Sequence, residues 1–198
     1  GPSQMALEDL AEFRAIHGST VLYPCDGNQT TALVRTMGEL EGISYLRTTR
    51  GDTPVVYGAD EAFPVGGSKT LREGDDVAIV AAGITVHEAM RAAETLAEDG
   101  ISARVIDCYS VKPIDGATLS GLRMPIVTVE DHWAEGGLGE AVLSALAERG
   151  ADTRVTRLAV RELPHSGKPA ELLAAAGIDA DHIAEAARAL VRESAGIS

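Results

Sequence analysis

VAIVAAGITVHEAMRAAETLAEDGISARVI, at residues 77–106, contains a strand, a helix and a second strand in succession. Residues 77–82 are an almost unbroken apolar run, which is typical of a strand buried on both faces. Residues 85–97 have the pattern of a helix that ends before Gly100, and residues 103–106 are predicted to form the next strand. This alternation predicts an α/β fold in which parallel strands are covered by helices.

The alternation continues on both sides of that stretch. Thr85 and Glu88 have the spacing of a capping box at the start of the central helix. The pattern predicts further strands at 20–23, 43–46, 54–57, 68–71, 125–129 and 153–159. It predicts further helices at 5–16, 26–42, 113–122, 138–149, 169–176 and 180–193.

Two units follow from this order, one at residues 1–72 and the other at 73–198. Residues 51–76 contain two prolines and a glycine pair, and they are typical of a crossing segment between the units. The first unit would leave both edges of its sheet open, which a free-standing domain rarely tolerates. The sequence therefore predicts an incomplete parallel-sheet unit followed by a fuller α/β domain.

The charge balance excludes one class of function. The 198 residues include 17 basic and 30 acidic side chains, for a net charge of −13. A basic surplus is needed to displace counterions from a nucleic acid, so we expect no nucleic-acid partner. No apolar run approaches the roughly 18 residues that span a bilayer, and there is no signal-peptide pattern. We therefore expect a soluble, cytoplasmic protein without a membrane partner.

The histidines and cysteines do not form a recognisable metal or catalytic site. Five histidines lie far apart without metal-ligand spacing, and the pair Asp131–His132 has no nucleophile at a sharp turn beside it. Cys25 and Cys108 are too few for a disulfide framework or a four-ligand zinc site. We expect both to be free thiols in the core.

The glycine-rich stretch at 135–139 follows a strand and opens a helix, which is a context in which backbone amides bind anions. A tight turn that lets a helix and a strand pack closely has the same pattern. Four acidic residues surround the stretch: Glu130, Asp131, Glu135 and Glu140. The residues favour the structural turn over the anion site.

Arg50 is the residue best placed for chemistry, because it follows the predicted strand at 43–46 by a few residues. Ligands of open α/β sheets gather outside the carboxyl ends of the strands. An arginine there suits a phosphate or a carboxylate. A surface salt bridge is the alternative, and the residues alone leave both possibilities open.

Several stretches taken together resemble the C-terminal half of a transketolase. They run from one end of the chain to the other: GPSQMALEDLAEFR at 1–14, YPCDGNQTTALV at 23–34, YLRTTR at 45–50, RVIDCYSVKPID at 104–115, VEDHWAEGGLGEAV at 129–142 and HSGKPAELLAAAGID at 165–179. The resemblance implies that residues 1–72 are the C-terminal part of a pyrimidine-binding domain. It implies that residues 73–198 are a three-layer C-terminal domain with a mixed five-stranded sheet.

The resemblance also implies a substrate site. Gln4 lies where the family has a histidine or glutamine that contacts a sugar hydroxyl or the developing oxyanion, so it is both a catalytic and a substrate-binding candidate. Arg50 lies where the family binds the sugar phosphate. The implied reaction, of the pentose phosphate pathway, transfers a two-carbon ketol unit from a ketose phosphate to an aldose phosphate.

The implied cofactors are thiamine diphosphate and Mg²⁺, whose binding motifs in the family lie outside this sequence. We therefore expect the chain alone to bind neither cofactor and to be inactive without an N-terminal portion or subunit. The implied assembly is a homodimer or a heterotetramer. For the glycine-rich stretch, the resemblance implies a structural role or a place in a subunit interface.

Two alternatives remain beside this interpretation. A deoxyxylulose-phosphate synthase or the beta subunit of a 2-oxoacid dehydrogenase has the same domain order, although GPSQM and SGKPAELL resemble transketolase more. A non-catalytic dimerisation or docking module would keep the fold, but it would have no chemical need for Gln4 and Arg50.

Overall fold

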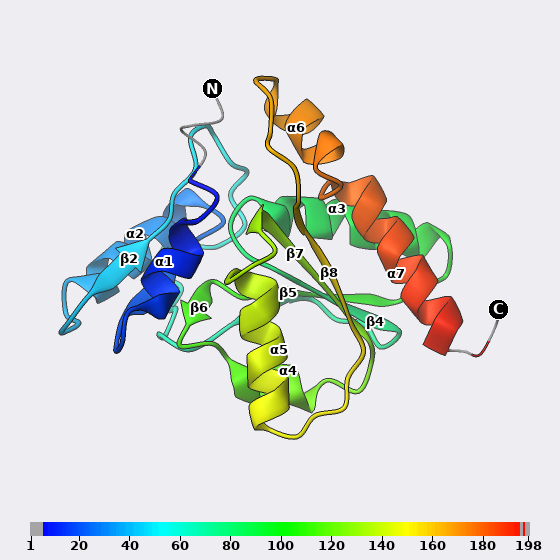
Figure 1. The fold of residues 1–198 in the computed structure, drawn as a ribbon, viewed down its shortest axis with the longest axis horizontal. Helices are drawn as coiled ribbons and strands as arrows, with labels where there is room; N and C mark the ends of the chain where they lie inside the picture. The colour runs from blue at the N-terminus through cyan, green and yellow to red at the C-terminus, as the bar shows by residue number, and fades with distance from the viewer. Residues whose placement is uncertain (1–5, 195, 197–198) are drawn as a thin grey trace.

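Two β-sheets organise the computed structural model, which describes residues 6–194 and 196 (Figure 1). The strands are β1 Thr20–Leu22, β2 Ser44–Leu46, β3 Lys69–Arg72, β4 Val77–Ala81, β5 Ala103–Asp107, β6 Ser110–Lys112, β7 Ile126–Trp133 and β8 Val155–Val160. The helices are α1 Asp9–Ala15, α2 Gly27–Met37, α3 Thr85–Glu98, α4 Gly116–Gly121, α5 Leu138–Glu148, α6 Pro169–Ala175 and α7 Ala180–Ser194.

The larger sheet has five strands in the order β3-β5-β4-β7-β8. Strand β3 is antiparallel to β5, and the other neighbours are parallel, so the sheet is mixed as expected. All five residues of the central strand β4 are buried, because helices cover both of its faces. The predicted strand–helix–strand unit at 77–106 is therefore the centre of this domain.

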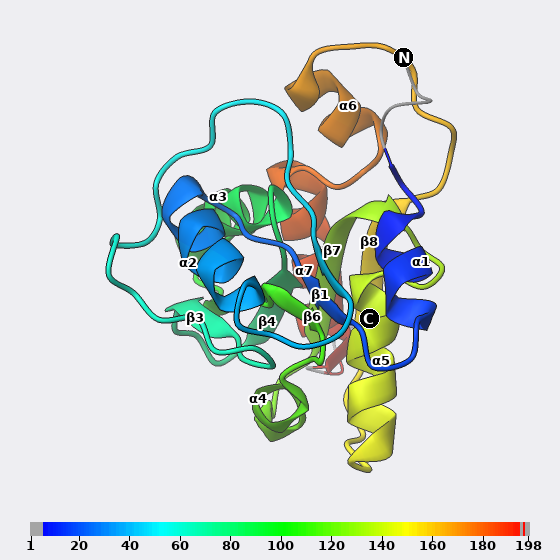
Figure 2. The ribbon, with the colours of Figure 1, turned by 90° about the vertical axis from the view of Figure 1, so that its left-hand side faces the viewer.

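The side chains of β4 alternate between two apolar clusters, as the period of a strand requires. Val77 and Ile79 pack in the cluster that contains buried residues of α3 and α7. Ala78 and Val80 pack in the cluster that contains buried residues of α4 and α5. Figure 2 shows the resulting three layers, with α3 and α5 on opposite sides of the sheet.

The smaller sheet has the order β2-β1-β6, and its third strand comes from the second half of the chain. Strand β1 is parallel to β2 and antiparallel to β6. The prediction that both edges of the first sheet are open is wrong at the β1 edge, where β6 donates and accepts the pairing hydrogen bonds. Outside β2, no further strand pairs within the described residues.

Residues 54–57 do not form the predicted strand. The backbone amides of Val56 and Tyr57 donate to the Asp26 carboxylate, at 2.7 and 2.8 Å, instead of to a neighbouring strand. The expected strand at 68–71 exists as β3, but it pairs with β5 in the larger sheet. A charged partner on the turn before α2 therefore replaces the sheet pairing that the apolar pattern suggested.

One predicted cap and several helix boundaries also differ from the sequence-based expectation: α1 begins only at Asp9, and α4 begins at Gly116 instead of residue 113. Thr85 does not cap α3: its hydroxyl donates to the carbonyls of Ala82 and Val129, and it is the first residue of the helix. Helix α2 ends at Met37, where Gly38 follows, and does not reach Gly42. Thr85 is fully buried, so its hydroxyl satisfies strand carbonyls that water cannot reach.

The two units interlock where Tyr23, which follows β1, lies over the turn that follows β4. A Cβ atom on Gly83 in that turn would lie 2.0 Å from the Tyr23 ring. Gly83 also has a φ of +60°, which L side chains rarely adopt. Only a glycine allows the first unit to approach the second this closely.

We expect Gly83→Ala to lower the free energy of unfolding by at least about 3 kcal/mol, from strain and overpacking combined. Gly100→Ala is the matched control, because Gly100 has a φ of +77° but no atom within 4 Å of its would-be Cβ. The control should cost only about 1 kcal/mol of conformational strain. Thermal unfolding of both variants measures the difference, and equal losses would contradict the interlock.

Candidate functional site

The candidate site lies where the carboxyl ends of β1 and β2 face the second unit. Arg50 is exposed here and makes no hydrogen bond or ion pair with the described residues, so the alternative of a surface salt bridge has no support among them. Gln4 lies outside the described residues. The structure therefore leaves the Arg50 guanidinium available to an anionic ligand.

Arg47, three residues before Arg50, is buried and holds the two units together. Its Nε lies 3.3 Å from Asp9 Oδ2, and its Nη1 lies 3.3 Å from Asp131 Oδ1. Its Nη2 donates to the Asp131 carbonyl at 3.0 Å, and its backbone amide donates to Leu22 at 2.9 Å. One guanidinium therefore joins α1, the end of β2 and the end of β7.

Two tyrosines complete this cluster. The Arg47 guanidinium lies 4.8 Å from the centre of the Tyr23 ring, and the Tyr23 hydroxyl donates to Asp131 Oδ2 at 3.0 Å. The Tyr45 hydroxyl donates to Asp9 Oδ2 at 2.6 Å. Burial alone would lower the pKa of Arg47, but the neighbouring charge of Asp131 raises it overall. The guanidinium therefore remains charged and paired.

Asp26 anchors the other end of the segment that carries Arg50. Its Oδ1 accepts the amide of Gln29 at 2.7 Å and so caps the N-terminus of α2. Its Oδ2 accepts the amides of Val56 and Tyr57. The segment 48–55 makes no backbone hydrogen bond with the described residues, so Arg47 holds it on one side and Asp26 is one of the groups that hold it on the other.

Asp107, at the end of β5, is the centre of a second buried cluster between the units. Its Oδ2 accepts hydrogen bonds from Gln29 Nε2 and the Tyr57 hydroxyl, both at 2.7 Å. Cys25 Sγ lies 3.7 Å from the same oxygen. Oδ1 is buried and has no partner among the described residues. The cluster joins β5 to the start of α2 and to the segment that ends at Tyr57.

Burial raises the pKa of Asp107 to about 7, although the hydrogen bonds from Gln29, Tyr57 and Cys25 oppose the shift. The carboxyl is therefore protonated in part of the molecules near neutral pH and in most of them at about pH 5 to 6. Burial likewise raises the pKa of the Cys25 and Cys108 thiols. Both cysteines are free and buried, as expected, and neither is present as a reactive thiolate.

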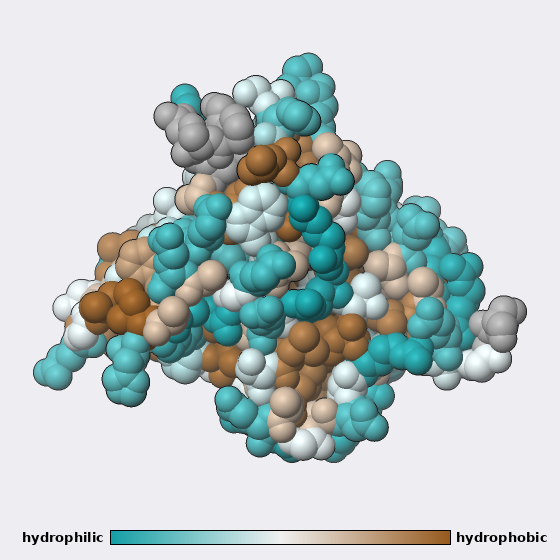
Figure 3. Space-filling view, viewed as in Figure 1, coloured by the Kyte–Doolittle hydropathy of each residue, from teal (hydrophilic) through white to brown (hydrophobic). Residues whose placement is uncertain are grey.

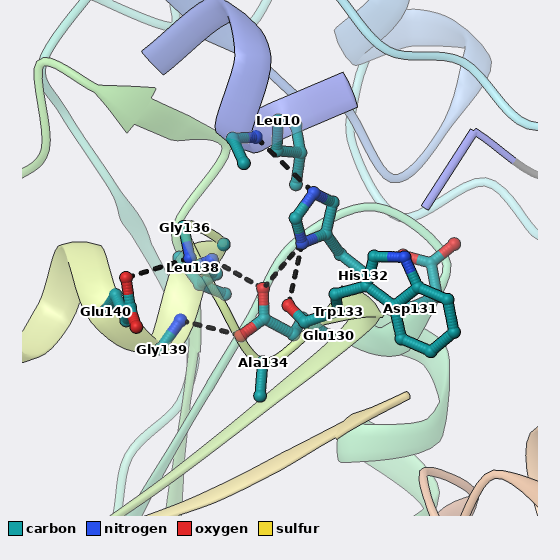
Figure 4. A network of polar contacts seen from close by, with 12 residues as sticks. Leu10, Glu130, Asp131, His132, Trp133, Ala134, Gly136, Leu138, Gly139 and Glu140 are labelled. Carbon is teal, nitrogen blue, oxygen red and sulfur yellow. Dashed lines mark hydrogen bonds and ion pairs between the residues drawn. The ribbon is translucent and has the colours of Figure 1, made fainter. Parts of the chain in front are cut away.

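The glycine-rich turn before α5 is already occupied by a carboxylate of this chain. Glu130 Oε1 accepts the amide of Gly139 at 2.9 Å, and Oε2 accepts the amide of Leu138 at 2.5 Å (Figure 4). A Cβ atom on Gly137 would lie 1.8 Å from Glu130 Oε2. The glycines therefore make room for an internal cap, which confirms the structural interpretation over the anion site.

His132 ties this turn to α1. Its Nδ1 lies 2.7 Å from the Trp133 carbonyl, and its Nε2 lies 3.4 Å from the Ala11 amide. These partners are satisfied together when Nδ1 carries the proton and Nε2 accepts. Burial lowers the pKa of His132, which favours the same neutral form. His132 is a satisfied buried residue, as expected for a histidine without a nucleophile beside it.

The described part of the chain holds no group of three or more His, Cys, Asp or Glu side chains placed to bind a metal. The helix start at the glycine-rich turn does not fit a diphosphate, because Glu130 occupies its amides. None of the helices described above has the length and apolar composition needed to cross a membrane.

Sequence reasoning missed Arg47, Asp107 and Asp26. A weak signal for Arg47 is present in YLRTTR, where a second arginine lies next to a strand that must be partly buried. Asp107 directly follows the strand predicted at 103–106, so it too lies at the carboxyl end of a strand. Nothing in the sequence shows that these residues come together across the two units.

A test of the buried Asp107 cluster uses the pH dependence of stability. The folded-state pKa of about 7 lies above the ordinary value near 3.9, so the folded state binds an extra proton between those values. This group therefore makes stability fall as pH rises from about 4 to 7, by at most about 4 kcal/mol. We expect Asp107→Asn to remove this slope in urea unfolding measured from pH 5 to 8.

Asp115→Asn is the matched control. Burial raises the pKa of Asp115, but hydrogen bonds from Thr118 and Ser68 lower it overall, so its titration lies below that window. The control should run parallel to the wild type from pH 5 to 8. A parallel curve for Asp107→Asn as well would show that Asp107 is ionised throughout.

Comparisons with known proteins agree with this architecture. The family model for the transketolase C-terminal domain matches residues 66–183, and the model for the transketolase pyrimidine binding domain matches residues 1–56. Transketolase of Mus musculus is 47% identical over 197 residues, which are 96% of this chain and 32% of that protein. Transketolase of Homo sapiens is 46% identical over 200 residues, 98% of this chain and 32% of that protein.

Solved structures agree as well. One described as a split gene transketolase, inactive beta4 tetramer, has a TM-score of 0.89 and 38% identity over 96% of this chain and 63% of that one. A Pichia stipitis transketolase in complex with sedoheptulose-7-phosphate has a TM-score of 0.79 and 26% identity over 99% of this chain and 28% of that one. The chain spans about a third of the length of the curated relatives it matches. It belongs to the transketolase family.

Proposed function

We propose that this chain is the C-terminal portion of a thiamine-diphosphate-dependent transketolase and that Arg50 binds the phosphate of its sugar substrates. The observation that carries the proposal is the placement of Arg50. Its guanidinium is exposed and unpaired among the described residues, at the carboxyl end of β2, where α/β sheets bind their ligands. A solved relative in complex with a sugar phosphate supports the substrate class.

Gln4 is proposed to contact a sugar hydroxyl or the developing oxyanion, because an amide can donate to both. Arg50 would orient the sugar by binding its phosphate at a distance from the reacting carbons. A fixed guanidinium fork suits a phosphate dianion better than a single ammonium group does. Arg50 would then orient the substrate, and Gln4 would stabilise the charge that develops during the reaction.

Thiamine diphosphate and Mg²⁺ are proposed to be held by residues of the N-terminal portion. When bound, the cofactor supplies the carbanion chemistry of ketol transfer. The described residues of this chain do not fit a diphosphate at the one glycine-rich helix start, since the Glu130 carboxylate fills that position. The contribution of this chain would be substrate binding.

The partner is proposed to be that N-terminal portion, in a homodimer or a heterotetramer acting in the cytoplasm in the pentose phosphate pathway. A relative described as an inactive beta4 tetramer of a split gene transketolase supports assembly with a separate chain. Apolar surface is also available: Val34, Ile43 and Leu143 are 53%, 49% and 39% exposed. Figure 3 shows apolar surface over α5 and on the β2 side of the molecule.

Calorimetric titration of thiamine diphosphate with Mg²⁺ tests whether the N-terminal portion is needed to bind the cofactor. We expect no binding to the purified chain alone, and binding together with ketol transfer once the matching N-terminal portion is added. Tight binding to the chain alone would mean that it holds the cofactor itself. No binding in either case would instead favour an inert fragment or the docking module.

Arg50→Ala tests the phosphate assignment in the assembled enzyme. The loss of a charge-assisted hydrogen bond of about 1.5–3 kcal/mol should raise KM for phosphorylated ketoses by roughly 10- to 150-fold. KM for a matched unphosphorylated ketose should change less than about twofold, because that substrate never contacts the guanidinium.

Arg35→Ala is the control for loss of a positive charge, because Arg35 is an exposed arginine of α2 in the same unit. It should leave both KM values unchanged. Equal effects of Arg50→Ala on the two substrates would remove Arg50 from the phosphate site.

A further inference from the structure

The segment that carries Arg50 is hydrogen-bonded at both of its ends and makes no hydrogen bond between them with the residues that the structure describes. Residues 48–55 make no backbone hydrogen bond with the described residues, while Arg47 and Tyr57 on either side of the segment are buried. Figure 2 shows the chain between β2 and β3 as an open arc. The position of Arg50 therefore depends on the two buried ends of this segment.

Both ends are fixed to aspartates of the second unit, in addition to Asp9 and Asp26 of the first unit. Before the segment, the Arg47 guanidinium binds the side chain and the carbonyl of Asp131, at 3.3 and 3.0 Å. After it, the Tyr57 hydroxyl donates to Asp107 Oδ2 at 2.7 Å. Asp131 belongs to β7 and Asp107 ends β5, so the two attachments lie on different strands of the five-stranded sheet.

This arrangement is more rigid than a segment held by the first unit alone would be. Arg50 lies three residues after Arg47, which is at most about 10 Å of extended chain. A displacement of about 1 Å in a group that orients a substrate is enough to weaken its action substantially. Buried pairs hold their geometry because breaking one leaves an uncompensated charge or polar group in the interior.

We infer that Asp107 and Asp131 are positioning residues that set the place of Arg50 through Tyr57 and Arg47. The inference rests on the proposed role of Arg50 as the phosphate-binding residue. It gives the C-terminal domain a part in substrate binding, although neither aspartate is proposed to touch the substrate. The domain acts as the rigid support to which the phosphate-binding segment is attached.

The test uses Tyr57→Phe and Asp131→Asn in the assembled enzyme. Tyr57→Phe removes one hydroxyl and keeps the ring that packs edge-on against Phe63, 4.8 Å away. Each variant should raise KM for a phosphorylated ketose by about three- to tenfold. KM for the matched unphosphorylated ketose should stay within about twofold, and kcat should be unchanged for both.

Tyr109→Phe is the matched control, since the Tyr109 hydroxyl donates to the Pro64 carbonyl and has no contact with the ends of the segment. It removes a comparable hydrogen bond from the same aromatic cluster, in which Phe63 also meets the Tyr109 ring. It should lower the melting temperature about as much as Tyr57→Phe does and leave both KM values unchanged.

The double variants Tyr57→Phe with Arg50→Ala and Asp131→Asn with Arg50→Ala separate positioning from general damage. If the aspartates act through Arg50, neither Tyr57→Phe nor Asp131→Asn adds anything to the KM of Arg50→Ala for the phosphorylated ketose. Full additivity, or equal effects on both substrates, overturns the inference.

If Arg50→Ala is selective for phosphorylated ketoses and neither single variant is, the inference fails and the proposed function stands. If Arg50→Ala itself is not selective, both fail.

Discussion

The buried guanidinium of Arg47 is the contact on which the junction of the two units depends. Its side chain is 6% exposed and faces Asp9 and Asp131, whose side chains are 9% and 14% exposed. Loss of one partner from such a cluster leaves an uncompensated charge and costs about 3–5 kcal/mol. A second contact also ties the first unit to the second half of the chain, since β6 supplies one of the three strands of its sheet.

The same junction accounts for the proposed chemistry. A phosphate-binding arginine must be exposed to accept its ligand and yet be held firmly enough to orient it. The structure meets both requirements by separating them: Arg50 is exposed, and its attachments at Arg47 and Tyr57 are buried. The carboxyl groups that hold the two ends of the segment, at Asp26, Asp107 and Asp131, accept hydrogen bonds inside the protein.

The larger domain was predictable because its signals are local. The apolar run of β4 and the helix after it read directly from residues 77–98, and the layers follow from the period of a strand. The contacts between the two units could not be predicted from the sequence. Strand β6 is three residues long, and its pairing with β1 joins positions about ninety residues apart, which no local pattern can show.

Some residues of the candidate site could likewise be predicted from the sequence, and others could not. Arg50 could be singled out because it follows a recognisable strand, and the role of the glycine-rich turn could be judged from its acidic surroundings. The strand expected at 54–57 was wrong because a distant carboxylate, Asp26, takes its amides. Arg47 and Asp107 are ordinary residues in the sequence, and only burial beside their partners gives them a role.

A crystal structure of the assembled enzyme with a bound ketose phosphate would show directly whether Arg50 binds the phosphate. The distance to measure is that from the Arg50 guanidinium to the phosphate oxygens of the sugar. We expect at least one nitrogen–oxygen distance in the hydrogen-bond range of about 2.7–3.2 Å, with Arg47 still paired to Asp131. A phosphate held by other residues, with Arg50 directed into solvent, would contradict it.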